Sequence, residues 1–158
     1  MEMPYKLEVL WCRTFQSVLK IGNYFMGYRM PKYLEGPGKI KELGAFLKGK
    51  GINDVLIVTG AGMVRRGQVQ PMLDGFEANG IRYTLQTYTT TDPTSDDVEA
   101  GYKTYKEHGC KSIVAIGGGS PIDAAKAMWI KYEYPECTFE DMCKVFGIPE
   151  LRRKAHFC

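Results

Sequence analysis

The sequence has no long apolar run, no compact block of basic residues and only two histidines. A membrane span needs about 20 consecutive apolar residues, and Glu2, Lys6 and Glu8 interrupt any signal-peptide core near the N-terminus. The 21 Lys and Arg residues are dispersed among 18 Asp and Glu residues, unlike the concentrated basic face that nucleic-acid binding requires. We therefore expect a cytoplasmic protein with neither a membrane nor a nucleic acid as partner.

Paired cysteines and metal-ligand clusters are missing as well. The five cysteines are odd in number and contain no C-x-x-C pair, which predicts free thiols. No histidine or acid is spaced to complete a tetrahedral set with Cys137 and Cys143. His108 precedes a predicted helix end, and His156 lies close to the C-terminus. With no general base, nucleophile or triad evident, we expect neither metal ligands nor catalytic residues in this chain.

Apolar runs and amphipathic segments alternate from residue 33 onward. The continuous runs 55–58 and 113–116 predict strands buried on both faces, and 81–85 alternates as a further strand. Helical spacing predicts helices over 40–47, 69–76, 96–108 and 121–131. This order predicts an α/β, Rossmann-like fold with a mostly parallel sheet, right-handed crossovers and helices on both faces. We assign residues 33–158 to one dinucleotide-binding domain and residues 1–32 to an N-terminal arm.

The arm is rich in aromatic residues and methionine. Val18, Ile21, Gly22 and Phe25 stand at helical spacing and predict a short amphipathic helix. Such a helix packs over the core or over another subunit, so we expect an oligomer contact and a homo-oligomer. A membrane-surface interpretation is weaker, because the polar face is not strongly basic.

The most specific motif is Gly-Gly-Gly-Ser-Pro-Ile-Asp-Ala-Ala-Lys at residues 117–126, between a predicted strand and a predicted helix. Glycines let the backbone approach a ligand closely. Ser120 suits the N-cap, Pro121 the first helical position and Asp123 the third position of a capping box. Free N–H groups at such a helix start predict a pyrophosphate site. The alternative is a tight, well-capped turn.

This string resembles the signature of the iron-type (group III) alcohol dehydrogenases, in which the loop holds the pyrophosphate of the cofactor. Residues 33–38 (YLEGPG) resemble the family's opening segment, and residues 55–60 look like its next strand. Asp92-Pro93-Thr94 resembles the family's Asn-Pro-Thr loop, which lies near the adenosine and ribose of the cofactor. The resemblance runs from about residue 33 to residue 131.

The resemblance implies the nucleotide-binding half of such an enzyme. In the family a divalent metal, usually iron, is held by one aspartate and three histidines on a helical second domain, which we expect to be absent here. The intact enzyme would interconvert a primary alcohol and an aldehyde, with metal polarising the oxygen and nicotinamide carrying hydride. We expect this truncated chain to be inactive alone. The implied cofactor-binding residues are Gly60, Arg65, Asp92, Thr94, Gly117, Gly118, Gly119, Ser120 and Asp123.

The glycine loop at residues 60–67 bears on the choice of cofactor. It lacks the G-x-G-x-x-G spacing. NAD-preferring members carry an aspartate at the position matched by Gly60, where a carboxylate binds the ribose 2′-OH and would repel a 2′-phosphate. Arg65 and Arg66 offer a cationic partner, although surface arginines are often only solvated. We predict NADP or NAD, with NADP slightly favoured. Asp92 replaces the family's asparagine, and an acid is unfavourable beside an anionic cofactor.

Two other functions remain open. One is a fragment of a relative of dehydroquinate synthase, which shares the fold and uses NAD with zinc in a lyase reaction. The other is a non-catalytic nucleotide-binding or assembly module. The arm and the loop at Gly60 favour the dehydrogenase over the lyase.

Overall fold

The computed structural model describes residues 4–25, 35–88, 92–144, 147–148, 150–151 and 154–158. The chain divides into two compact units, Met1–Glu35 and Gly36–Cys158, and each is considered by itself. The boundary expected between residues 32 and 33 lies outside the described residues, so the division into arm and domain stays a prediction. In the part of the chain that is described, no helix has the length and apolar character needed to cross a bilayer.

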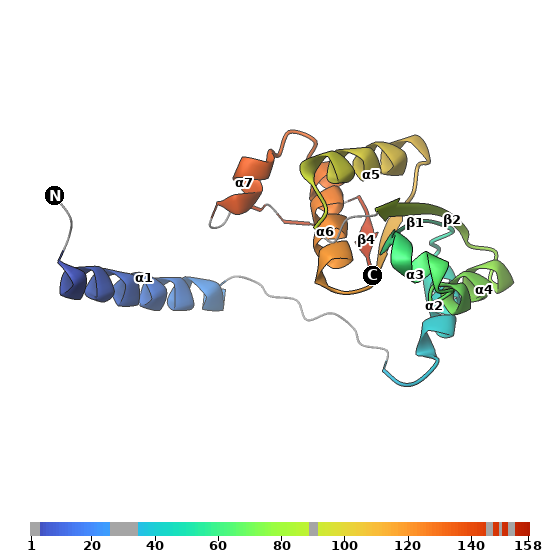
Figure 1. Ribbon diagram of the computed structural model, residues 1–158, viewed down its shortest axis with the longest axis horizontal. Helices are drawn as coiled ribbons and strands as arrows, with labels where there is room; N and C mark the ends of the chain where they lie inside the picture. The colour runs from blue at the N-terminus through green and yellow to red at the C-terminus, as the bar shows by residue number, and fades with distance from the viewer. Residues whose placement is uncertain (1–3, 26–34, 89–91, 145–146, 149, 152–153) are drawn as a thin grey trace. The chain divides into compact units, whose positions relative to one another are not determined.

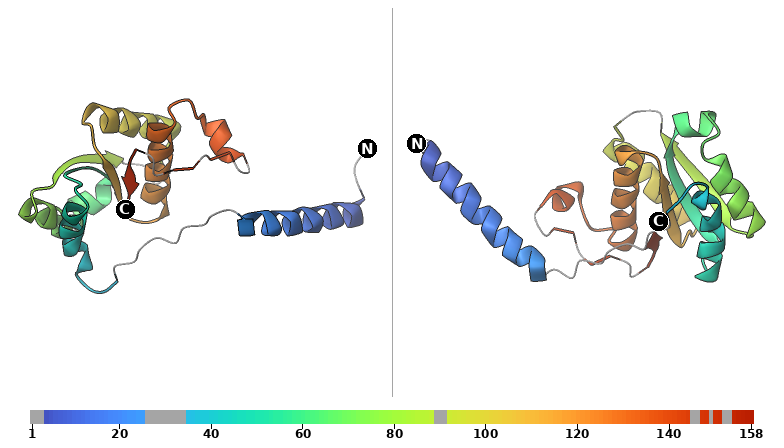
Figure 2. Two further views of the ribbon diagram at one scale, coloured as in Figure 1. Left: turned by 180° about the vertical axis from the view of Figure 1, so that it is seen from behind. Right: turned by 90° about the horizontal axis from the view of Figure 1, so that it is seen from below.

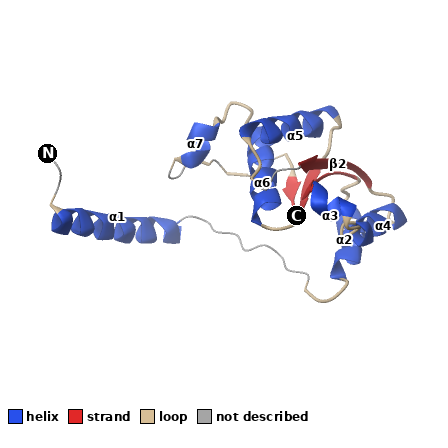
Figure 3. Cartoon of the chain, viewed as in Figure 1, coloured by secondary structure: helices blue, strands red, loops and turns tan. Residues whose placement is uncertain are grey.

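A parallel sheet forms the centre of the second unit (Figure 1, Figure 3). Its strand order is β2-β1-β3-β4, and each neighbouring pair is parallel. The strands are β1 (Asp54–Gly60), β2 (Arg82–Tyr88), β3 (Ser112–Ile116) and β4 (His156–Phe157). The apolar runs therefore form the strands that the sequence predicts, and a further short strand, β4, pairs with β3.

Helices connect the strands and cover both faces of the sheet (Figure 2). They are η1 (Lys39–Glu42), α2 (Leu43–Gly49), α3 (Ala61–Arg65), α4 (Gln70–Ala78), α5 (Ser95–Glu107), α6 (Gly119–Glu133) and α7 (Phe139–Cys143). The predicted α/β fold is confirmed. The sequence did not predict α3 or α7, because five residues are too few to show a helical period.

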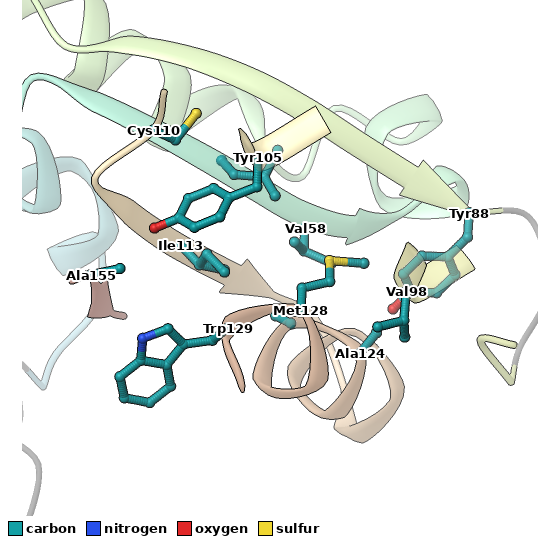
Figure 4. Packing of buried hydrophobic residues seen from close by; sticks show 12 residues of the cluster. Val58, Tyr88, Val98, Tyr105, Cys110, Ile113, Ala124, Met128, Trp129 and Ala155 are labelled. Atoms are coloured by element: carbon teal, nitrogen blue, oxygen red, sulfur yellow. The ribbon is translucent and has the colours of Figure 1, made fainter. Parts of the chain in front are cut away.

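Strand β1 separates two apolar clusters. Leu56 and Val58 point into a cluster with Tyr105 of α5 and Met128 of α6 (Figure 4). The alternate side chains of β1 point to the other face, where they pack with α2 and α4; this second cluster contains Leu47, Val55, Ile57, Met72, Leu73 and Phe76. Burial of each aliphatic side chain contributes about 1.5–3 kcal/mol. The sheet is thus held from both sides, with α2 and α4 on one face and α5 and α6 on the other.

The described residues of the first unit form helix α1 (Tyr5–Phe25), of 21 residues. It is longer than the short helix predicted from Val18 and its neighbours. The rings of Trp11 and Phe15 stack at a centroid distance of 6.5 Å. Large apolar side chains of α1 are nevertheless exposed, among them Leu7, Leu10, Trp11, Phe15, Val18 and Ile21. The expected contact with other copies stays a prediction.

A buried carboxylate attaches the last described segment to α6. The side chain of Glu133 is only 3% exposed. Its Oε1 accepts hydrogen bonds from Trp129 Nε1 at 2.9 Å and from the backbone N–H groups of Lys154 and Ala155, each at 3.4 Å. The Lys154 ammonium in turn donates to the backbone carbonyl of Glu133 at 2.9 Å. Glu133 therefore fixes the residues that lead directly into β4.

We predict that Glu133→Leu lowers the free energy of unfolding by about 3 kcal/mol, because it leaves buried donors without an acceptor. Glu133→Gln keeps an oxygen in the same place and should cost only about 1 kcal/mol. Urea unfolding of the two variants and the unchanged chain measures both values. If the Leu and Gln variants lost equal free energy of unfolding, Glu133 would not act as the acceptor of these hydrogen bonds.

Candidate functional site

Two glycine loops lie at neighbouring strand ends, where the connections run to opposite faces of the sheet. From β1 the chain passes through α3 and α4, on one face, to β2; from β2 it returns through α5, on the other face, to β3. β1 and β3 are neighbours, with Thr59 opposite Ile116, so the next residues, Gly60 and Gly117, leave adjacent strand ends. Connections that diverge from adjacent strands leave a crevice at the carboxyl edge, where α/β proteins bind ligands.

The start of α6 lies beside this crevice and carries no side-chain cap. Gly118 is its N-cap, with extended backbone (φ −81°, ψ −158°), and no acid stands in the first turn. The predicted caps are therefore wrong: Ser120 is inside the helix, and Asp123 Oδ1 pairs with Lys126 Nζ at 3.1 Å. The helix begins two residues earlier than predicted, since a glycine can serve as N-cap and boundaries shift readily. Its first N–H groups thus remain available to an anion.

The glycines of this loop lie in different surroundings. Gly117 has φ +144°, and a Cβ there would lie 2.5 Å from Pro121 Cγ and 3.3 Å from Met63 Sδ. The fold therefore requires Gly117, and the contact with Met63 brings α3 against the loop. A Cβ on Gly118, Gly119 or Gly60 would meet nothing within 4 Å. These three positions are open, which is the environment that close approach of a ligand to the backbone needs.

A pocket of about 690 Å³ lies between the α5 start, α6 and α7. Its volume is typical of small-molecule sites, which span about 300–1,000 Å³. The predicted site residues that line it are Asp92, Thr94, Gly119, Ser120 and Asp123. Gly117 and Gly118 adjoin it along the chain, whereas Gly60 and Arg65 do not line it. The pocket also contains Phe139, which no motif of the sequence singled out.

Thr94 has a second role that the sequence did not show. It is the N-cap of α5: its hydroxyl accepts from Asp97 N–H at 3.3 Å, and its N–H donates to Asp97 Oδ2 at 2.8 Å. Asp96 adds a second acid to the first turn. Backbone N–H groups at the start of α5 therefore already have hydrogen-bond acceptors within the chain itself. An anion at this edge of the sheet is better accommodated at α6.

The cationic side chains near Gly60 belong to the end of α3. Arg65 is exposed and is the last residue of α3. Arg66 folds back so that its Nη1 lies 3.1 Å from the point where a Cβ on Gly62 would stand. Its Nε donates to Gln68 Oε1 at 3.2 Å. Arg66 is thus the guanidinium that the structure brings close to the backbone of this glycine loop.

Another pocket, of about 530 Å³, lies at the amino ends of the strands. There Arg82 donates to both carboxylate oxygens of Asp54, at 2.6 and 3.0 Å. The hydrogen bonds from Arg82 lower the pKa of Asp54, and burial raises the pKa of the Cys110 thiol. His108 is the C-cap residue of α5, where its backbone N–H donates to the carbonyl of Thr104, and it lines the same pocket. The Asp54–Arg82 pair ties β1 to β2 at the edge opposite the glycine loops.

Within the described residues, no group of three or more His, Cys, Asp or Glu side chains is arranged to hold a metal ion. The family described as "Iron-containing alcohol dehydrogenase" matches residues 31–156. The chain belongs to this family. The family of the glycine motif is thus confirmed, which favours the dehydrogenase interpretation over the lyase.

Relatives within the iron-containing alcohol dehydrogenase family extend this result. The NADPH-dependent butanol dehydrogenase of Clostridium saccharobutylicum is 41% identical over 133 residues, covering 84% of this chain and 34% of the relative. The iron-containing alcohol dehydrogenase of Thermococcus thioreducens superposes with a TM-score of 0.71 at 27% identity, covering 84% and 35% of the two chains. The sulfoacetaldehyde reductase of Bifidobacterium kashiwanohense, solved with NAD+, gives a TM-score of 0.57 at 25% identity, covering 67% and 29%. The chain therefore spans about a third of the length of such relatives.

The glycine analysis predicts different stabilities for two neighbouring substitutions. Gly117→Ala should lower the free energy of unfolding by about 2 kcal/mol, because it combines positive φ with a clash against Pro121. Gly118→Ala should change it by less than about 0.5 kcal/mol, since the backbone is extended and the space is open. Urea unfolding followed by far-UV circular dichroism distinguishes the two. A Gly118→Ala variant as unstable as Gly117→Ala would show that the open space is filled.

Proposed function

We propose that this chain binds NAD(P)(H) as the nucleotide-binding part of an alcohol dehydrogenase that interconverts a primary alcohol and an aldehyde. The observation that carries the proposal is the uncapped start of α6 beside the open Gly118 and Gly119. Backbone N–H groups and the positive end of the helix dipole favour a pyrophosphate there. The crevice between β1 and β3 gives the rest of a dinucleotide a path across the sheet.

The proposed residue roles follow from these positions. Gly117, Gly118, Gly119 and Ser120 would hold the pyrophosphate, with Asp123 beside it in the pocket. Asp92 and Thr94 border the same pocket from the start of α5. When bound, the nicotinamide ring supplies the hydride acceptor or donor of the reaction.

We further propose that the 158-residue chain binds the nucleotide without turning over alcohol by itself. The described residues provide no cluster of metal ligands, whereas the family is named for the iron that its members contain. A metal that polarises the substrate oxygen would then be held by residues of a longer protein. The span of about a third of the relatives' length supports this division.

The environment of Gly60 supports a preference for NADP over NAD. Gly60 has no side chain to repel a 2′-phosphate, and Arg65 and Arg66 stand at the end of the helix that it begins. The relative from C. saccharobutylicum is named for its use of NADPH. The sulfoacetaldehyde reductase was solved with NAD+, so both cofactors occur among similar proteins.

A fluorescence titration with NADPH, and separately with NADH, tests nucleotide binding by the 158-residue chain. We expect saturable binding that is tighter for NADPH. Gly118→Val should abolish this binding while keeping the thermal melt of the unchanged chain, because the added methyl groups occupy the open space over the loop. A folded chain that binds neither nucleotide would refute the proposal.

Gly60→Asp should shift the preference toward NADH, with the ratio of the two dissociation constants changing by about tenfold or more. The position tolerates the side chain, since Gly60 has φ −77° and ψ 139° and nothing near its Cβ. The same titration measures the ratio. An unchanged ratio would rule out Gly60 as the determinant of cofactor choice.

A further inference from the structure

Phe139 is the aromatic side chain of the α5–α6–α7 pocket. It is the first residue of α7 and lines the pocket together with Val98 of α5 and Ala124 and Ala127 of α6. These neighbours are small or aliphatic, and the ring is only half-buried. One wall of the pocket is therefore apolar and flat, while Gly119 and Ser120 at the start of α6 form a polar part.

Lys131 holds the ring in place from outside the pocket. Its ammonium lies 5.5 Å from the Phe139 ring centroid and 2.9 Å from Glu99 Oε1 on α5. The Lys131 side chain is only 13% exposed, so these contacts are partly shielded from solvent. A cation over an aromatic face is attracted by the ring, and the attraction is stronger where the pair is partly desolvated. One side chain of α6 thus links α5 to α7 and fixes the aromatic wall.

The start of α7 is also fixed locally. Thr138 caps the helix, with its hydroxyl accepting from Asp141 N–H at 3.1 Å and its N–H donating to Asp141 Oδ2 at 3.1 Å. A hydrogen bond from Lys144 contributes to lowering the pKa of Asp141. Asp141 consequently stays ionised at neutral pH, and the capping box persists. The residue immediately after the cap is Phe139. The cap therefore sets its backbone position, and Lys131 contacts its ring.

We infer that Phe139 is the stacking wall for a flat ring of the bound dinucleotide, and that Lys131 is a positioning residue for this wall. The inference rests on the proposed function and adds a ring subsite to it. A dinucleotide whose pyrophosphate lies at the start of α6 has one ring within reach on either side of that group. Aromatic rings stack favourably on such a wall, beyond the gain from the apolar area that they bury.

The ring is either the adenine or the nicotinamide, and ligand fragments distinguish the two. ADP-ribose contains the adenine and the pyrophosphate, reduced nicotinamide mononucleotide contains the other ring, and inorganic pyrophosphate contains neither. Each is titrated into the 158-residue chain as a competitor of NADPH, and the dissociation constants are compared between the unchanged chain and its variants.

Phe139→Leu should weaken the binding of NADPH about tenfold. It should weaken the binding of one ring-containing fragment similarly and leave the binding of inorganic pyrophosphate unchanged. Lys131→Met should weaken the binding of the same ligands about threefold. Lys131→Arg should restore their binding, because it keeps the cation and the partner Glu99. A purely structural role of Lys131 would instead weaken pyrophosphate together with the rings.

Phe46 on α2 offers a matched control, because Lys50 lies over its ring at 5.3 Å in the same kind of contact away from the pocket. Phe46→Leu should leave every dissociation constant unchanged. NADPH binding that survives Phe139→Leu, or an equal loss for all ligands including pyrophosphate, would overturn the ring subsite. Failure of the unchanged chain to bind both NADPH and pyrophosphate would instead refute the proposed function.

Discussion

The second unit depends on the pairing of β1 with two parallel neighbours at once. Residues 55–59 of this strand are all buried, and β1 makes a seven-residue register with β2 and a five-residue register with β3. Its side chains divide between two clusters that α2 and α4 complete on one face and α5 and α6 on the other. Because the connection to β2 starts from this strand and the connection from β2 to β3 returns beside it, the crevice at Gly60 and Gly117 follows from the pairing itself.

Continuous apolar runs and glycines made the larger part of this arrangement predictable. The runs at residues 55–58 and 113–116 predicted strands covered on both faces, and the glycines after the second run predicted a pyrophosphate site at a helix start. The start of α6 was misplaced because residues 117–120 contain several acceptable cap residues, and sequence rules favour Ser120 over Gly118 by its hydroxyl. The actual boundary depends on how the backbone leaves β3, which local composition does not encode.

The features that the sequence did not reveal have other causes. Phe139 enters the pocket from a segment 16 residues beyond Asp123, and no spacing rule relates the two positions. Lys131 was taken only as the end of a predicted helix, yet it contacts Glu99 and Phe139 from other helices. Thr94 matched a family loop, and this match concealed its local role as a cap of α5. Contacts between elements distant in the chain decide the roles of Phe139 and Lys131, whereas the role of Thr94 rests on a contact with Asp97 three residues away.

The starts of α5 and α6 face the same pocket with opposite electrical character. One carries two acids and a complete capping box, whereas the other carries neither an acid in its first turn nor a side-chain cap. Two helix dipoles that would otherwise act alike are therefore made unequal by Thr94, Asp96 and Asp97. The pocket consequently has an electrostatic direction, with its anion-favouring side at the start of α6. An anionic group that enters this pocket is therefore drawn toward α6 and kept away from α5.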